Sequence, residues 1–139
     1  GVPAELETII EVRESDCDRL GHLNHVQAVR MLERARGHWY TANGLRDAGR
    51  NYVPVVVNIN YDYRRECFLG ERLRVMTRGQ RLGRKSFTLG HEIIKPDGAI
   101  ALQGAATSVI MDLDSRVIVT VPECVARHLP TLPAREAEE

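Results

Sequence analysis

The stretch that decides the fold is DCDRLGHLNHVQAVRMLERAR, residues 16–36. Its second half repeats apolar residues at helical spacing, namely Ala28, Met31, Leu32 and Ala35. Asn24 is a favoured N-cap residue, and Gln27 stands where a capping box needs a glutamine or glutamate. The sequence therefore predicts a helix over about 25–42, which ends before Gly44 because glycine readily adopts the left-handed conformation common at helix ends.

The segments on both sides of this helix have the alternation of β-strands. Residues 6–13 precede it, with β-branched residues in mild alternation. From Pro54 onward apolar residues recur at every second position, which predicts one face made of Val55, Val57, Ile59, Tyr61 and Tyr63. Turn residues at 70, 82–84 and 95–98 divide the rest into strands, and a short helix is possible over 122–128.

The connections between these strands are too short for parallel crossovers, so the strands must pair in antiparallel fashion. The prediction is an α+β fold in which one long helix packs against a five-stranded antiparallel sheet. One helix cannot cover both faces of such a sheet, and the strand over 99–111 is apolar on both faces. We therefore expect a second copy of the chain to cover the remaining surface.

Length and charge restrict the class of protein further. The chain has 139 residues, with 19 basic and 19 acidic side chains. This length suits one core, so we expect a single domain over 1–133 and a polar tail over 134–139. The balanced charge argues against a nucleic-acid partner. Because no apolar run reaches the ~20 residues of a membrane span, we expect a cytoplasmic protein with no membrane span.

The chemistry concentrates between the first strand and the helix. Asp16, Asp18, His22 and His25 lie within ten residues of one another, immediately before or at the helix start. Amides at a helix start are unpaired donors that can stabilise an oxyanion, and a nearby carboxylate can attack a carbonyl or activate water. Two other interpretations stay open: the aspartates can be simple caps, and the four side chains can be metal ligands. His91, on an apolar strand face, is expected to be structural.

The same residues carry a resemblance to a known family. The run over 16–36, with its Asp-x-Asp, its glycine and its closing Glu33-Arg34-Ala35-Arg36, resembles the signature of hot-dog fold acyl-CoA thioesterases of the 4-hydroxybenzoyl-CoA thioesterase type. The resemblance covers nearly the whole chain. It implies a hot-dog fold and a hydrolase acting on an acyl-CoA or an acyl-carrier-protein thioester. Glu33 and Arg36 are expected to form a pair on the helix face.

The resemblance also implies roles for individual residues. Asp18 matches the catalytic aspartate, acting as nucleophile or as general base for water. His25, at the oxyanion site of the helix start, is a candidate for orienting the thioester or the water. Arg84 and Lys85 resemble a basic pair directed at the phosphates of coenzyme A. No metal and no separate cofactor is implied, since coenzyme A is part of the substrate.

The family's pocket lies between subunits, so the resemblance implies a homodimer or a homotetramer. Two alternative functions remain open at this point. One is an acyl-thioester dehydratase or hydratase with the same fold, although the Gly-Asp-x-Asn-Pro-x-x-His type of motif is missing. The other is a non-catalytic module that binds an acyl-CoA.

Overall fold

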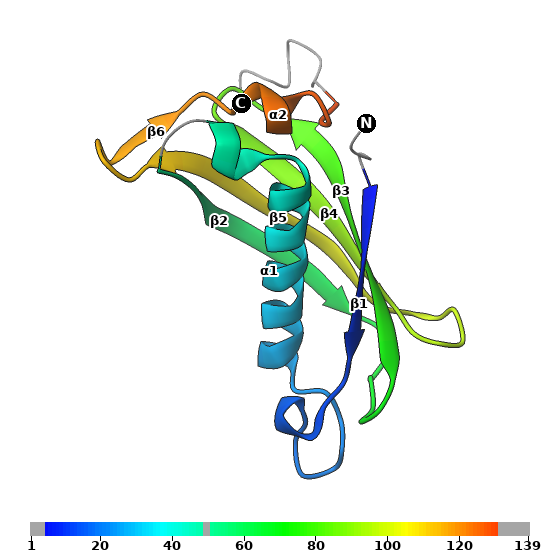
Figure 1. The fold of residues 1–139 in the computed structure, drawn as a ribbon. Coiled ribbons are helices and arrows are strands. Elements are labelled where there is room, and N and C mark those ends of the chain that lie inside the picture. Colours follow the sequence, from blue (N-terminus) through cyan, green and yellow to red (C-terminus); the bar gives the residue numbers. More distant parts are fainter. Residues whose placement is uncertain (1–4, 49–50, 131–139) are drawn as a thin grey trace.

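The computed structural model describes residues 5–48 and 51–130, which form one curled antiparallel sheet with a long helix packed on it (Figure 1). The expected tail over 134–139, and the expected domain end at 133, lie outside the described residues. The elements in chain order are β1 (Glu5–Glu11), α1 (His25–Ala42), β2 (Tyr52–Tyr63), β3 (Arg72–Leu82), β4 (Ser86–Ile94), β5 (Ile100–Asp112), β6 (Val117–Val119) and α2 (Glu123–Ala126), with single 3₁₀ turns at Glu14–Asp16 and Leu45–Ala48.

The sheet has the strand order β1-β3-β4-β5-β2, and β6 pairs with the end of β5 (Figure 1). The α+β prediction is confirmed, including its five antiparallel strands and the short helix near 122–128. The short strand β6 was not predicted. Its three residues are too few to show an alternation in sequence, and the strand forms because the turn before it returns the chain alongside β5.

The prediction for α1 is confirmed at both ends. The Asn24 side chain accepts a hydrogen bond from the Val26 amide at 2.8 Å, and Gly44 has a φ of +77°. The predicted capping box is wrong, because the Asn24 amide donates to the Asp16 carbonyl at 2.8 Å instead of to Gln27. The helix start is thereby tied to the loop that carries the two aspartates.

The helix buries one face against the sheet. Its buried residues are Ala28, Met31, Leu32, Ala35, Arg36, Trp39 and Tyr40. Met31, Leu32 and Ala35 join an apolar cluster of the core with Leu73, Val75, Ile93 and Leu102. Trp39 and Tyr40 join a second cluster, near the helix end, with Phe87, Leu89 and Ile110. All but one of the buried helix residues are apolar or aromatic, and the exception is Arg36.

The strand β2 is an edge strand, since it pairs with β5 on one side only. A register shift between Val56 and Asn58 places a bulge at Val57. The predicted single face from Val55 to Tyr63 is therefore wrong: Ile59, Tyr61 and Tyr63 share the helix side, but Val55 points to the other side. A pattern of period two cannot show a bulge, because the extra residue only shifts the alternation.

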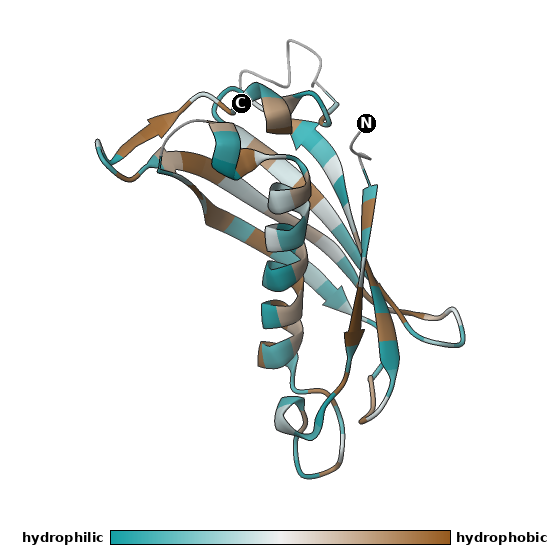
Figure 2. Ribbon diagram, viewed as in Figure 1, coloured by the Kyte–Doolittle hydropathy of each residue, from teal (hydrophilic) through white to brown (hydrophobic). Residues whose placement is uncertain are grey.

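Apolar residues are exposed along this edge. Every residue from Val55 to Asn60 is exposed, and Val57 keeps 59% of its surface. Figure 2 shows apolar residues as brown segments along β2. An exposed apolar edge strand of this length is a template for pairing with another chain.

Candidate active site

Asp18 lies in an exposed loop before α1 and organises that loop. Its Oδ1 accepts hydrogen bonds from the amides of Leu20 at 2.9 Å and His22 at 3.0 Å. Its Oδ2 has no hydrogen-bond partner within the described part of the chain. One carboxylate oxygen thus holds the loop in shape, and the other is available for chemistry.

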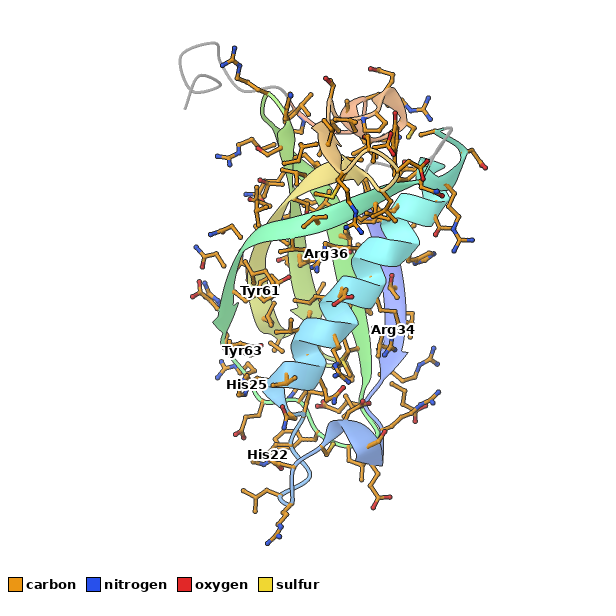
Figure 3. All side chains as sticks on the ribbon, turned by 90° about the vertical axis from the view of Figure 1, so that its left-hand side faces the viewer. His22, His25, Arg34, Arg36, Tyr61 and Tyr63 are labelled. Carbon is orange, nitrogen blue, oxygen red and sulfur yellow. The ribbon has the colours of Figure 1, made fainter. Side chains whose placement is uncertain are left out.

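A pocket of about 470 Å³ opens beside the helix start. Its lining residues are Leu23, His25, Ala28, Tyr63, Arg64, Arg65, Glu66, Cys67, Ile93, Ala101 and Leu102. The Tyr63 hydroxyl donates to the His25 carbonyl at 3.1 Å, and the two rings meet edge to face (Figure 3). The predicted site residue His25 therefore lines a pocket with an apolar floor, but Asp18 of the same chain does not line it.

The first amides of α1 supply donors at this pocket. The Val26 amide is used by the Asn24 cap, whereas the amides of His25 and Gln27 have no acceptor among the described residues. Both carry the positive end of the helix dipole. A carbonyl oxygen placed at this helix start would gain hydrogen bonds that strengthen as negative charge develops on it.

Charged side chains surround the mouth of the pocket. His22 Nδ1 lies 3.1 Å from Glu66 Oε1, and Lys95 lies 3.4 Å from Glu71 and above the Phe68 ring. Arg64 and Arg65 line the pocket directly. Neither arginine was predicted from the sequence to be a site residue. Their sequence signal was the Arg-Arg pair at the end of the strand that begins near Pro54. The antiparallel order of the strands does not by itself show that this strand end lies next to the helix start.

Arg84 and Lys85 lie in the exposed turn between β3 and β4, at the opposite end of the sheet from the pocket. The register shows this separation. The start of β4 at Ser86 is level with Val55, near the beginning of β2, whereas the pocket lies at its end, at Tyr63. Within one chain, the predicted basic pair and His25 are therefore not brought together.

The sequence-based prediction for Arg36 is wrong. It does not form the expected surface pair with Glu33; only 4% of its surface is exposed, and its Nη1 lies 2.8 Å from the Tyr61 hydroxyl and 3.2 Å from His91 Nε2. Burial, and secondly the charge of Arg36, lowers the pKa of His91 to about 3, so this histidine is neutral. Burial raises the pKa of Tyr61. Figure 3 shows Arg36 and Tyr61 between α1 and β2.

The cysteines near the site are poor candidates for a nucleophile. Burial, and secondly Asp16, raises the pKa of Cys17, and burial raises that of Cys67 to about 11. A thiol with a raised pKa has little thiolate at neutral pH.

The metal alternative also finds no support, because no group of three His, Cys, Asp or Glu side chains converges in the described ranges 5–48 and 51–130. Over the same ranges, no helix is long and apolar enough to cross a membrane.

The fold and the pocket are those of a known class of protein, and comparisons with known proteins agree on the class. A long helix on a curled antiparallel sheet, with a pocket at the helix start, is the hot-dog architecture of thioester hydrolases. The chain belongs to the Thioesterase-like superfamily, whose sequence description matches residues 12–129. The predicted hot-dog fold and the predicted thioester hydrolase class are confirmed at this level; the 4-hydroxybenzoyl-CoA type stays a prediction.

Individual relatives agree with this assignment. The chain is 31% identical to the long-chain acyl-CoA thioesterase FadM of Escherichia coli over 121 residues, covering 80% of this chain and 86% of FadM. Its fold is similar to that of the DHNA-CoA thioesterase of Staphylococcus aureus, with a TM-score of 0.76, 21% identity and coverage of 84% and 80% of the two chains. It is also similar to a 1,4-dihydroxy-2-naphthoyl-CoA thioesterase of Synechocystis, with a TM-score of 0.76, 17% identity and coverage of 90% and 95%.

Proposed function

We propose that the protein hydrolyses an acyl-CoA thioester to a free acid and a thiol, with Asp18 as the catalytic carboxylate. The observation that supports this most directly is the combination of a free Asp18 oxygen with unpaired amides at the start of α1. The similarity to FadM supports coenzyme A as the thiol, and an acyl-carrier-protein thioester remains the alternative substrate. The superfamily assignment favours hydrolysis over the dehydratase and the non-catalytic binding module.

The chemistry assigns each group one task. The amides of His25 and Gln27 donate hydrogen bonds to the developing oxyanion, and the His25 side chain orients the thioester or the water. Asp18 Oδ2 either attacks the carbonyl carbon and displaces the thiolate, which gives a mixed anhydride that water then hydrolyses, or takes the proton from a water that attacks the carbonyl carbon and displaces the thiolate. A thiolate leaves readily because the pKa of its thiol is only about 8.5, so a single carboxylate is enough. No step requires a metal or a separate cofactor.

The active unit is a homodimer joined through the β2 edges. The exposed apolar residues from Val55 to Ile59 support this arrangement. Antiparallel pairing of two β2 strands would cover them and would give hydrogen-bond partners to the backbone N–H and C=O groups of the free edge. A two-fold axis through such a pair makes each strand of the partner's sheet run opposite to the same strand of the first chain. The partner's β3–β4 turn, with its Arg84 and Lys85, then lies at the Tyr63 end of the first chain, three strand spacings or about 14 Å away. A tetramer made of two such dimers is compatible with the same pairing.

The test is thiol release from a panel of aliphatic and aromatic acyl-CoAs. We expect Asp18→Asn to lower kcat at least about a thousandfold, since it removes the charge needed for attack or proton transfer. Asparagine keeps an Oδ1 acceptor for the Leu20 and His22 amides, so the loop should stay intact.

Asp16→Asn is the matched control. Asp16 lies in the same loop and accepts one backbone hydrogen bond, from the Arg13 amide at 2.9 Å. We expect this variant to retain most of the activity. Equal losses in the two variants, or more than about a tenth of wild-type kcat in Asp18→Asn, would remove Asp18 from the mechanism.

A further inference from the structure

The pocket at the helix start lies over a row of side chains that crosses the sheet. Tyr63 of β2 is opposite Leu102 of β5, and Leu102 is opposite Ile93 of β4. Ile93 is in turn opposite Val75 of β3. Residues directly opposite in antiparallel strands point to the same face of the sheet, and this is the face that packs against α1. The row therefore leads from the edge strand into the core beneath the helix.

The pocket follows the first three members of this row and then ends. Tyr63, Leu102 and Ile93 line it, whereas Val75 does not. Val75 is fully buried in the same apolar cluster as Leu32, and Ile93 keeps only 1% of its surface exposed. The inner end of the pocket is therefore closed at Ile93.

The other sides of the pocket are closed by groups of the same chain. Ala28 of α1 covers the pocket, and Leu32, one helical turn further, is fully buried and does not line it. The pocket therefore does not continue along the helix. On the side of the loops, the Leu23 amide donates to the Cys67 carbonyl at 2.8 Å. Because all these groups belong to one chain, the closure does not depend on the partner.

The mouth of the pocket is polar and its interior is apolar. Arg64, Arg65 and Glu66 are exposed at the mouth, and His25 with its unpaired amide lies beside Tyr63 at the same end (Figure 3). A thioester carbonyl that meets the His25 amide would therefore have coenzyme A on the side of the solvent. Its acyl group would enter the apolar interior, where burial is favourable.

The length of the pocket limits the length of this acyl group. The Tyr63 hydroxyl donates to the His25 carbonyl, so the helix start lies next to Tyr63. Ile93 is two strand spacings from Tyr63, which is about 10 Å. An extended chain advances about 1.2 Å per bond, so about eight bonds span this distance.

The volume of the pocket agrees with this limit. A methylene group occupies about as much space as a water molecule in the liquid, about 30 Å³, so an eight-carbon group needs about 240 Å³ and a sixteen-carbon group about 480 Å³. The pocket has about 470 Å³, and part of that is its open mouth. The shorter group fits inside, and the longer one does not.

We propose that this pocket holds the acyl group and that Ile93 limits its length, so that the preferred substrates are thioesters of acyl groups with about eight carbons or fewer. This inference rests on the proposed function and specifies its substrate class. Carbons beyond the eighth stay outside the pocket and gain no burial.

The experiment measures binding of S-alkyl thioethers of coenzyme A, which cannot be hydrolysed, with even chain lengths from two to fourteen carbons. Affinities are determined by isothermal titration calorimetry at concentrations below those at which the thioethers form micelles. In the wild-type protein we expect the affinity to rise about fourfold for each methylene up to about eight carbons. Beyond that length the affinity should change little.

Ile93→Ala should move this limit, because the next residue of the row, Val75, lies one strand spacing or about 4.8 Å further in. We expect the affinity of this variant to rise up to about ten to twelve carbons. Ile94→Ala is the matched control: Ile94 follows Ile93 in β4 and pairs with Arg74 on the opposite face of the sheet. Its limit should stay at about eight carbons.

Hydrolysis provides the second readout. We expect wild-type kcat/KM to be about tenfold higher for octanoyl-CoA than for tetradecanoyl-CoA, and Ile93→Ala to reduce this ratio. The inference would be overturned by a wild-type affinity that keeps rising through fourteen carbons, or by one that does not depend on chain length at all. Both results are read in the wild-type protein, so they decide the inference even if Ile93→Ala fails to fold. The thioether series needs no turnover, so it gives its answer whether or not Asp18 is the catalytic carboxylate.

Discussion

Tyr61→Phe tests whether the contact between Tyr61 and the buried Arg36 contributes to stability. The substitution deletes the hydroxyl that lies 2.8 Å from Arg36 Nη1 and leaves the ring in place. A hydrogen bond to a charged group contributes about 1.5–3 kcal/mol, and loss of the burial cost of the hydroxyl offsets part of that, so we expect a loss of about 2 kcal/mol. For 139 residues the unfolding entropy is about 0.3 kcal/mol/K, which converts this loss into a decrease of about 7 °C in Tm.

The matched control is Tyr63→Phe. This tyrosine lies two residues further along β2, is 50% exposed, and donates to the His25 carbonyl. Because water can replace that partner, we expect a loss below about 0.5 kcal/mol. Both variants are compared with the wild-type protein by thermal and urea denaturation at one protein concentration. Similar losses at the two positions would refute the reasoning. So would an undiminished effect of Tyr61→Phe in the Arg36→Met background, because a double-mutant cycle isolates the pair.

Two further predictions concern the sheet. Burial lowers the pKa of His91 from 6.5 to about 3. Between these pH values the unfolded chain binds a proton that the folded chain does not, so the free energy of unfolding decreases as the pH falls. We expect urea denaturation to show a loss of about 2 kcal/mol between pH 6.5 and pH 5 in the wild-type protein and no such loss from this position in His91→Gln. In Gly104→Ala the new Cβ would meet the Asn60 carbonyl oxygen and the Tyr61 Cα, so we expect the free energy of unfolding to decrease by at least about 3 kcal/mol. Gly37→Ala on α1 places its Cβ in open space and should increase the free energy of unfolding by about 0.5–1 kcal/mol. A change of the same sign in both variants would contradict this prediction.

The sequence was sufficient for the parts of the fold that depend on local signals. The Asn24 cap, the apolar spacing of α1 and the turns between strands each act within a few residues, and the structure contains all of them. The bulge at Val57 and the strand β6 depend instead on the partner strand β5, so no local pattern predicts them.

Arg36 shows a different limit of the sequence. Its spacing from Glu33 is that of a surface ion pair, and only the packing of α1 on the sheet decides that the side chain turns inward to Tyr61 and His91. The predicted site residues show the same limit. His25 lines the pocket, but Asp18, Arg84 and Lys85 do not, and whether they serve the same reaction depends on a second chain.

A subunit complementation experiment decides that question. In the dimer proposed above, each site combines Asp18 of one chain with Arg84 and Lys85 of the other. A mixed dimer of an Asp18→Asn chain and an Arg84→Gln/Lys85→Gln chain then has one site with both defects and one site with neither. If the two variants are unfolded together in equal amounts and refolded, half of the dimers are mixed, and about a quarter of the wild-type sites are restored.

The outcome distinguishes a site shared between two chains from a site formed within one chain. This works because each variant alone is expected to have lower activity at low substrate concentration. If Asp18 and the basic pair of the same chain served one site, every site in the mixture would carry one defect, and refolding would restore nothing. Refolding each variant separately and then combining them controls for residual activity. Recovery only on joint refolding would establish a site that combines Asp18 of one chain with Arg84 and Lys85 of the other, as antiparallel pairing of two β2 edges predicts.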